Sequence, residues 1–211
     1  MDIREVLKRS GVVPVIVIEE EAKAVPLARA LVKGGLGVLE VTFRTKAAAA
    51  AIRAEVPEAV VGAGTLVTPE MARAAFEAGA AFGVAPGFDP AVVNAAKELG
   101  LPFVPGIATA SELSQALTVG LRIVKFFPAE AAGGVKMIKN LLGAFRFTGV
   151  EFMPTGGISL ANLRDYLAVP EVLCCGGTWV APKDAIARCD WAAIESLAAE
   201  AAACANCGSL V

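Results

Sequence analysis

The chain of 211 residues contains no histidine. This absence excludes Ser-His-Asp and Cys-His catalysis, histidine phosphorylation and metal sites built on imidazole. Any acid–base chemistry must therefore use carboxylates, lysine, cysteine or the single tyrosine, Tyr166.

The sequence also lacks a long apolar run and a strong excess of charge. The apolar run at 12–18 spans seven residues and is followed at once by three glutamates, whereas a membrane-spanning helix needs about 20 residues. A net charge of −2 gives no reason to expect nucleic acid or an acidic membrane as a partner. Residues 1–10 mix acids with bases, unlike a signal peptide. We expect a soluble, cytoplasmic protein whose apolar strands are buried on both faces.

The chain has five cysteines, but their placement does not predict a metal site. Cys174 and Cys175 are adjacent in an apolar strand, so we expect them to face opposite sides as small core residues. Cys204 and Cys207 form a lone C-x-x-C with no second pair and no histidine to complete four zinc ligands. We therefore predict no metal or redox role for this pair.

Short apolar runs alternate with alanine-rich helical patterns along the whole chain. Strands are predicted at 12–18, 37–43, 60–65, 81–86, 102–107, 123–128, 151–156 and 172–177. Helices are predicted at 2–9, 22–33, 46–55, 69–78, 90–99, 111–118, 134–142, 160–168 and after Asp190.

The helix signals are specific at several ends. Thr68 before Pro69 and Asp89 before Pro90 are typical N-caps followed by proline at the first helical position. Gly79 and Gly100 are typical residues at which a helix ends.

Eight strand–helix units in so short a chain indicate an α/β fold, a single-domain (β/α)8 TIM barrel over residues 1–211. The short helix at 2–9 precedes the first strand and is placed to plug the bottom of the barrel. An open doubly wound sheet is the alternative. It usually has fewer strands, and the first strand–helix turn here lacks G-x-G-x-x-G.

Lys125 interrupts an otherwise apolar strand, "IVKFFP" at 123–128. Glu40 is likewise a charged residue in the second predicted strand. Because both strands are even-numbered, the two side chains can share a layer of the barrel interior, towards the C-terminal ends where barrel active sites lie. We expect Lys125 and Glu40 to meet on the barrel axis.

A buried Glu–Lys pair is weak evidence for a stabilising role, because desolvation of both charges offsets their attraction. Chemistry is therefore the favoured explanation, although a purely structural pair stays open. Burial disfavours an ammonium group, and a neutral amine can attack a carbonyl to form a Schiff base. Glu40 is the carboxylate placed to transfer protons.

Two glycine pairs follow the seventh and eighth predicted strands, in "PTGGIS" at 154–159 and "CGGTW" at 175–179. In barrels, the loops after these two strands commonly bind phosphate through backbone N–H groups. The predicted phosphate site comprises Gly156, Gly157, Gly176, Gly177 and Thr178, although turns also use glycine for conformational reasons alone.

Arg44 and Thr65 lie at the ends of the second and third predicted strands. An arginine can hold a carboxylate through paired hydrogen bonds and a threonine hydroxyl can add to it, but a solvated arginine and a turn-capping threonine are equally open. Pro86 and Phe127 could form pocket walls or could simply be packing residues.

These residues resemble the bacterial 2-keto-3-deoxy-6-phosphogluconate (KDPG) aldolases, which also act on 4-hydroxy-2-oxoglutarate (KHG). The resemblance is carried, in order from residue 12 to 179, by "VVPVIVI", "LEVTFRT", "VGAGT", "APG", "VPGIAT", "VKFFPAE", "PTGGIS" and "GGTW". It implies homotrimers of (β/α)8 barrels that need no cofactor and no metal. One departure is Thr178, where many members have serine; its extra methyl could alter the phosphate pocket.

The resemblance also implies a role for each matched residue. Lys125 would be the Schiff-base lysine and Glu40 the general acid/base. The pyruvate carboxylate would be held by Arg44 and Thr65, the substrate hydroxyls would lie near Thr155, and the phosphate would be held by Gly156, Gly157 and Thr178.

The implied reaction is cleavage of KDPG to pyruvate and glyceraldehyde 3-phosphate, as in the Entner–Doudoroff route of carbohydrate metabolism. KHG, which would give pyruvate and glyoxylate, and the galactonate epimer of KDPG stay open as substrates. A barrel that binds or isomerises a phosphosugar without a covalent intermediate is the alternative function.

Overall fold

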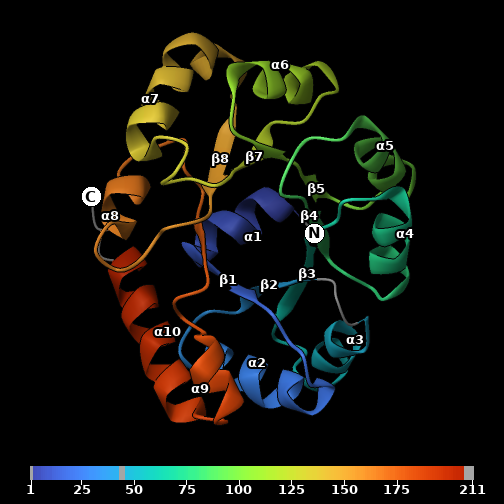
Figure 1. Cartoon of the computed structure of the whole chain (residues 1–211), viewed down its shortest axis with the longest axis vertical. Helices are drawn as coiled ribbons and strands as arrows, with labels where there is room; N and C mark the ends of the chain where they lie inside the picture. The colour runs from blue at the N-terminus through green and yellow to red at the C-terminus, as the bar shows by residue number, and fades with distance from the viewer. Residues whose placement is uncertain (1, 43–45, 207–211) are drawn as a thin grey trace.

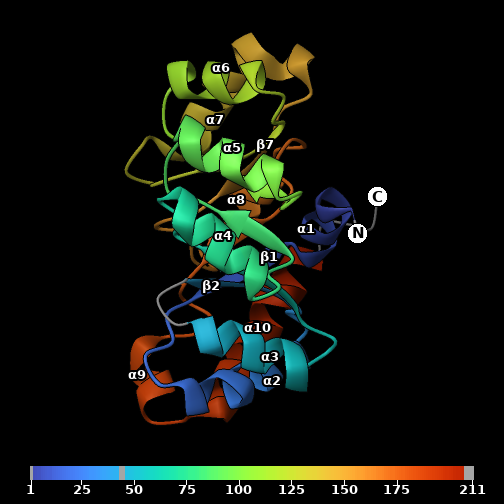
Figure 2. The same ribbon diagram turned by 90° about the vertical axis from the view of Figure 1, so that its right-hand side faces the viewer.

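The computed structural model describes residues 2–42 and 46–206, with side chains for all of these except 46 and 47. Helices surround the strands on all sides in the view down the shortest axis (Figure 1). The ring is elongated, with α6 and α7 at one end and α2, α3 and α9 at the other (Figures 1 and 2). The strands are β1 (Val12–Ile16), β2 (Val38–Thr42), β3 (Val60–Gly64), β4 (Phe82–Val84), β5 (Phe103–Val104), β6 (Gly106–Ile107), β7 (Ile123–Phe126), β8 (Glu151–Pro154) and β9 (Cys175–Gly177).

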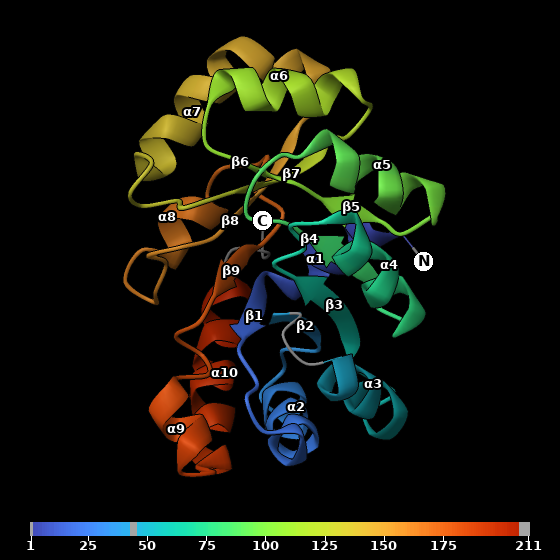
Figure 3. The ribbon, with the colours of Figure 1, turned by 45° about the vertical axis from the view of Figure 1, so that its right-hand side comes forward.

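All strand pairs in the described residues are parallel. One sheet has the order β5-β4-β3-β2-β1-β9 and the other β6-β7-β8. The six-stranded sheet curls into a half-barrel, and the three-stranded sheet lies across its open side (Figure 3). Isolated bridges join Phe152 to Val172 and Thr155 to Gly176, between β8 and the β9 segment.

Several predicted strands differ from those observed. The predicted strands 12–18 and 81–86 are shorter, at Val12–Ile16 and Phe82–Val84. The predicted strand 102–107 is divided at Pro105 into β5, which pairs with β4, and β6, which pairs with β7. Proline has no N–H to donate to a ladder, although the Pro105 carbonyl still accepts from the Lys125 N–H at 2.8 Å. The predicted strand 172–177 begins only at Cys175.

The strands are joined and flanked by helices close to their predicted positions. They are α1 (Ile3–Ser10), α2 (Ala24–Lys33), α3 (Lys46–Glu55), α4 (Pro69–Glu77), α5 (Pro90–Glu98), α6 (Ala110–Thr118), α7 (Gly134–Phe145), α8 (Leu163–Leu167), α9 (Lys183–Ala187) and α10 (Trp191–Asn206). The 160–168 prediction was too long, since α8 starts at Leu163, and α9 was not predicted.

The predicted helix boundaries are confirmed where a specific cap was named. The Thr68 side chain accepts from the Met71 N–H, and Asp89 accepts from the Ala91 N–H. Gly79 and Gly100 follow α4 and α5 with φ of 77° and 67°, a left-handed conformation that glycine adopts without steric cost.

The core has an inner part enclosed by the strands and an outer part between strands and helices. The inner cluster includes Val13, Val38, Phe82 and Cys174, and Leu7 of α1 packs into it. Figure 1 shows α1 lying across the middle of the ring, as expected of a helix that plugs the bottom. Cys175 belongs to the outer cluster, so the two cysteines face opposite sides as predicted.

Among residues 2–42 and 46–206, no helix has both the length and the apolar composition needed to cross a bilayer.

Candidate active site

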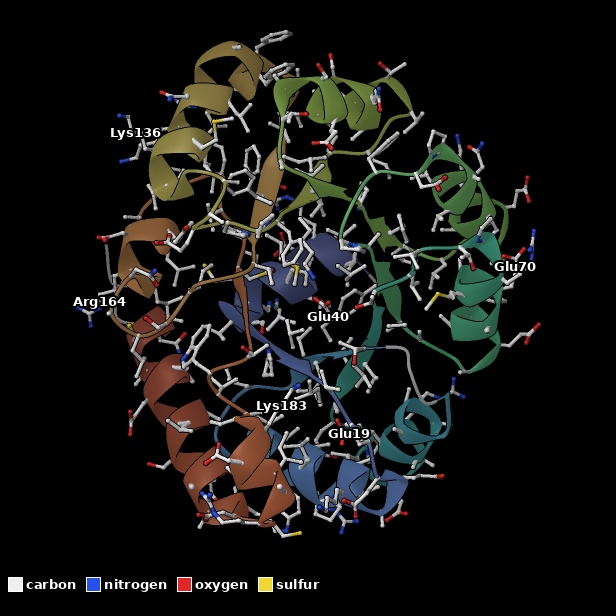
Figure 4. All side chains as sticks on the ribbon, viewed as in Figure 1. Glu19, Glu40, Glu70, Lys136, Arg164 and Lys183 are labelled. Carbon is white, nitrogen blue, oxygen red and sulfur yellow. The ribbon has the colours of Figure 1, made fainter. Side chains whose placement is uncertain are left out.

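The Lys125 and Glu40 side chains meet inside the ring of strands. The Lys125 Nζ donates to Glu40 Oε1 at 2.9 Å and lies 3.3 Å from Oε2. Both residues are buried, with 5% and 1% of their surface exposed. In Figure 4, Glu40 points to the middle of the ring, whereas Glu70 and Lys136 point outward. The expected meeting of the two side chains is therefore confirmed.

Glu40 lies at the centre of β2, not towards its C-terminal end as predicted. In register it pairs with Val15 of β1 and Gly62 of β3, so its backbone is hydrogen-bonded within the sheet on both sides. The backbone of Glu40 stays at the centre of the strand, and its side chain extends towards the C-terminal end of the barrel.

Two glycines of β3 make room for this arrangement. A methyl group on Gly64 would lie 2.4 Å from Glu40 Oε1, and one on Gly62 would lie 2.3 Å from the Phe82 ring. The Glu40 carboxylate thus extends over Gly64, one inward-facing layer above its own register partner. The pattern of "VGAGT" predicts a strand but gives no sign of this steric role.

The electrostatic environment of the pair is simple. Within the described part of the chain, Glu40 forms an ion pair with Lys125 and no other cation. Burial, followed by the nearby negative charge of Glu40, raises the pKa of the Cys174 thiol. This thiol therefore stays protonated and is no competing nucleophile beside Lys125.

The aromatic ring of Phe127 lies close to the amine. Its centroid is 5.6 Å from Lys125 Nζ, and the side chain is half-buried. Pro86 is also half-buried, and its backbone crosses Gly106 so closely that a methyl group there would meet the Pro86 carbonyl at 2.2 Å. Gly106 pairs in register with Lys125, so the Pro86 backbone lies against the strand next to the lysine. The pocket-wall roles of Pro86 and Phe127 stay predictions.

The backbone at the end of β8 is held firmly. Ala129 N–H donates to the Thr155 carbonyl at 2.8 Å, and Glu130 N–H donates to the Gly156 carbonyl at 3.0 Å. Gly156 and Gly157 have φ of 103° and 79°, which glycine adopts readily. Thr155 is buried, and its hydroxyl has no hydrogen-bond partner among the described residues.

Gly176 and Gly177 lie within β9, where packing also requires them. A methyl group on Gly176 would lie 2.3 Å from the Thr155 hydroxyl oxygen, and one on Gly177 would lie 1.6 Å from the Trp179 ring. Their lack of a side chain therefore has a structural reason besides the predicted phosphate site. Thr178, directly after β9, is exposed.

Thr65 follows β3 with φ of 63°, a left-handed conformation that is uncommon for a threonine. Strained backbone of this kind clusters at functional sites. Arg44, predicted with Thr65 to hold a carboxylate, lies outside the described residues. Its role stays a prediction.

A hydrogen bond that was not predicted from the sequence supports the Gly156–Gly157 loop. The Tyr166 hydroxyl donates to the Glu130 carboxylate. A methyl group on Gly157 would lie 2.6 Å from Glu130 Cγ, so Glu130 packs directly over the loop. Burial, and then the hydrogen bond to Glu130, raises the pKa of Tyr166.

No three Asp, Glu or Cys side chains of the described segments lie close enough together to hold a metal ion. The arrangement instead offers a buried amine next to a single carboxylate. Such a pair can form an imine with a carbonyl compound and move protons around it. The fold and site define an enzyme class, that of the class I (Schiff-base) aldolases, which are carbon–carbon lyases.

Comparison with known proteins gives the family. The model of the KDPG and KHG aldolase family matches residues 3–197. The KHG/KDPG aldolase of Escherichia coli is 51% identical over 93% of this chain and 92% of its own length. The 2-dehydro-3-deoxy-phosphogluconate aldolase of Treponema pallidum is 50% identical over 92% of both chains.

Solved structures of the same family are similar to this chain. The KDPG aldolase of Legionella pneumophila, with pyruvate captured as a covalent carbinolamine, is 41% identical with a TM-score of 0.90, covering 94% of this chain and 97% of the other. The Zymomonas mobilis enzyme with 3-phosphoglycerate is 45% identical with a TM-score of 0.89, covering 96% and 95%. The chain belongs to the KDPG and KHG aldolase family.

Proposed function

We propose that the protein cleaves 2-dehydro-3-deoxy-6-phosphogluconate to pyruvate and glyceraldehyde 3-phosphate through an imine on Lys125. The observation that carries this proposal is the buried Lys125–Glu40 contact of 2.9 Å. The names of relatives about half identical over nearly the whole chain support the choice of substrate.

The first step is capture of the ketone. Neutral Lys125 attacks C2 of the substrate, and loss of the C2 oxygen as water leaves a protonated imine. Glu40, which holds the amine in the free protein, is placed to accept the proton released as the amine becomes neutral and to return it to the departing C2 oxygen, which leaves Glu40 as a carboxylate for the next step. Arg44 and Thr65 are proposed to hold the carboxylate next to C2.

The second step is cleavage. Glu40, through a water molecule, removes the proton from the C4 hydroxyl, and the C3–C4 bond breaks with its electron pair moving into the cationic imine. The aldehyde leaves, and an enamine remains on Lys125. Glu40 then returns a proton to C3, and water hydrolyses the imine to release pyruvate and the free amine. No step requires a metal or another cofactor.

The far end of the substrate is assigned to the ends of β8 and β9. Thr155 is proposed to contact the substrate hydroxyls, while Gly156, Gly157, Gly176, Gly177 and Thr178 are proposed to bind the phosphate. KHG, which ends in a carboxylate, is expected to react as well, giving pyruvate and glyoxylate. Values of kcat/KM for KDPG, its galactonate epimer and KHG would rank these substrates. A preference for KHG over KDPG would contradict the phosphate assignment.

The two sheets are proposed to be parts of one closed (β/α)8 barrel that forms a single domain over residues 1–211. Counting β5 and β6 as one strand interrupted at Pro105 gives the eight strands required. The bridges between β8 and the β9 segment support closure on the other side. A homotrimeric assembly and a cytoplasmic location stay predictions, and analytical ultracentrifugation would test the former.

Borohydride trapping tests the covalent mechanism directly. The protein is incubated with pyruvate and sodium borohydride, digested and analysed by mass spectrometry. We expect a reduced pyruvate adduct on Lys125 and loss of activity. An active enzyme that gives no adduct would contradict the imine and favour a barrel that binds or isomerises a phosphosugar without covalent chemistry.

A further inference from the structure

Thr42, the last residue of β2, has a buried hydroxyl without a hydrogen-bond partner in the described part of the chain. Only 8% of the residue surface is exposed. Leaving a buried hydroxyl unpaired costs about 1–3 kcal/mol, and valine would give nearly the same shape without that cost. Packing among the described residues therefore gives no reason for the hydroxyl.

The position of Thr42 points to Glu40. Side chains alternate along a strand, so Thr42 lies on the same face of β2 as Glu40 and one layer closer to the C-terminal end. Thr42 pairs in register with Gly64, and the Glu40 Oε1 atom lies 2.4 Å from where a Gly64 methyl group would be. The Glu40 carboxylate thus lies at the level of Thr42, one layer beyond the level of the Glu40 backbone.

The hydrogen bonds of Glu40 must change during the reaction. In the free protein both carboxylate oxygens face the Lys125 amine, at 2.9 and 3.3 Å. In the protonated imine this nitrogen is bonded to C2 and keeps a single N–H. One Glu40 oxygen therefore loses its donor at the stage when Glu40 transfers protons.

We propose that Thr42 is a positioning residue for Glu40: once Lys125 is converted to the imine, the Thr42 hydroxyl donates a hydrogen bond to the Glu40 carboxylate and fixes its orientation for proton transfer. Among the described residues, the hydroxyl has no partner in the free protein, where Glu40 is held by Lys125. This inference rests on the proposed Schiff-base mechanism.

Thr42→Val removes the hydroxyl and keeps the shape, and Thr42→Ser keeps the hydroxyl. Two rates are measured: kcat for KDPG cleavage, and exchange of the pyruvate methyl protons in D2O, which isolates enamine formation and reprotonation. For Thr42→Val we expect both rates to fall about 10- to 100-fold, the loss expected when a group that transfers protons is misplaced. We expect KM to change less than about threefold. For Thr42→Ser we expect recovery of both rates to within about threefold of the wild type.

A double-mutant cycle separates action through Glu40 from a general structural effect. Adding Thr42→Val to Glu40→Gln is expected to lower kcat little further, because the group that Thr42 orients is already disabled. Full additivity would overturn the proposal. Wild-type rates in Thr42→Val, or a raised KM with unchanged kcat, would overturn it as well, the latter indicating contact with substrate instead.

Two controls keep the result interpretable. The melting temperature of Thr42→Val should match or exceed that of the wild type, because no hydrogen bond to a described residue is lost. Should that variant fail to fold, Thr42→Ala compared with Thr42→Ser gives the same contrast. Borohydride trapping of pyruvate should persist in Thr42→Val. Failure of trapping in the wild type would sink the Schiff-base mechanism itself, a different outcome from loss of exchange in the variant alone.

Discussion

Gly64→Ala is expected to displace the Glu40 carboxylate without changing any ionisable group. The added methyl carbon would lie 2.4 Å from Oε1, 2.7 Å from Cγ and 2.9 Å from Cδ of Glu40. Favourable contacts between such atoms need about 3.5 Å, so the side chain must move by roughly 1 Å. The backbone of β3 at this position does not require glycine, because Gly64 is absent from the residues with positive φ.

A displacement of this size affects the catalytic pair directly. The 2.9 Å contact between Lys125 Nζ and Oε1 would lengthen beyond hydrogen-bonding distance. A misplacement of about 1 Å can lower a rate by about 100-fold. We therefore expect kcat for pyruvate release, followed with lactate dehydrogenase and NADH, to fall by about two orders of magnitude.

The control is Gly37→Ala, directly before β2. Its methyl group would meet only the Glu58 carbonyl oxygen, at an ordinary 3.7 Å, so its kcat should stay close to that of the wild type. Circular dichroism of both variants reports whether they are folded at the assay temperature. A folded Gly64→Ala enzyme with a kcat within threefold of the wild type would refute the steric reasoning and the importance of the Glu40 position.

Three further predictions concern the Lys125–Glu40 pair, Tyr166 and the need for a metal. Lys125→Ala should abolish turnover and borohydride trapping, whereas Glu40→Gln should still be trapped but cleave KDPG slowly; a Glu40→Gln enzyme as fast as the wild type would exclude proton transfer by Glu40. Folding raises the pKa of Tyr166 above its usual value near 10. The contribution of Tyr166 to the free energy of unfolding should therefore be fully present below about pH 10 and should decrease above it, as the tyrosine of the unfolded chain ionises. Tyr166→Phe should lower the free energy of unfolding, measured with urea, by about 1–3 kcal/mol at neutral pH, and should remove its decrease above about pH 10. If the free energy of unfolding of this variant still decreases above about pH 10 as in the wild type, Tyr166 is not the source of the decrease. Incubation with EDTA should leave kcat unchanged, and strong inhibition that added metal reverses would contradict the metal-free mechanism.

The sequence by itself determined the local structure and the central pair. Thr68 and Asp89 cap their helices as predicted, because capping depends on residues only two or three positions away. Lys125 and Glu40 could be paired in advance because alternation along a strand and layering in a barrel are regular. An isolated charge in an apolar strand needs a partner, and the fold class left few candidates.

The tertiary structure decided which atoms share space across strands. The steric need for Gly64 beneath Glu40, and for Gly176 beside Thr155, follows from register between segments that are distant in sequence. Packing also decides the division of one predicted strand at Pro105, the Tyr166–Glu130 hydrogen bond, and the burial of a Thr42 hydroxyl that has no partner among the described residues. Local patterns report only the neighbours along the chain, whereas close packing is set by residues that meet only after the sheets have formed.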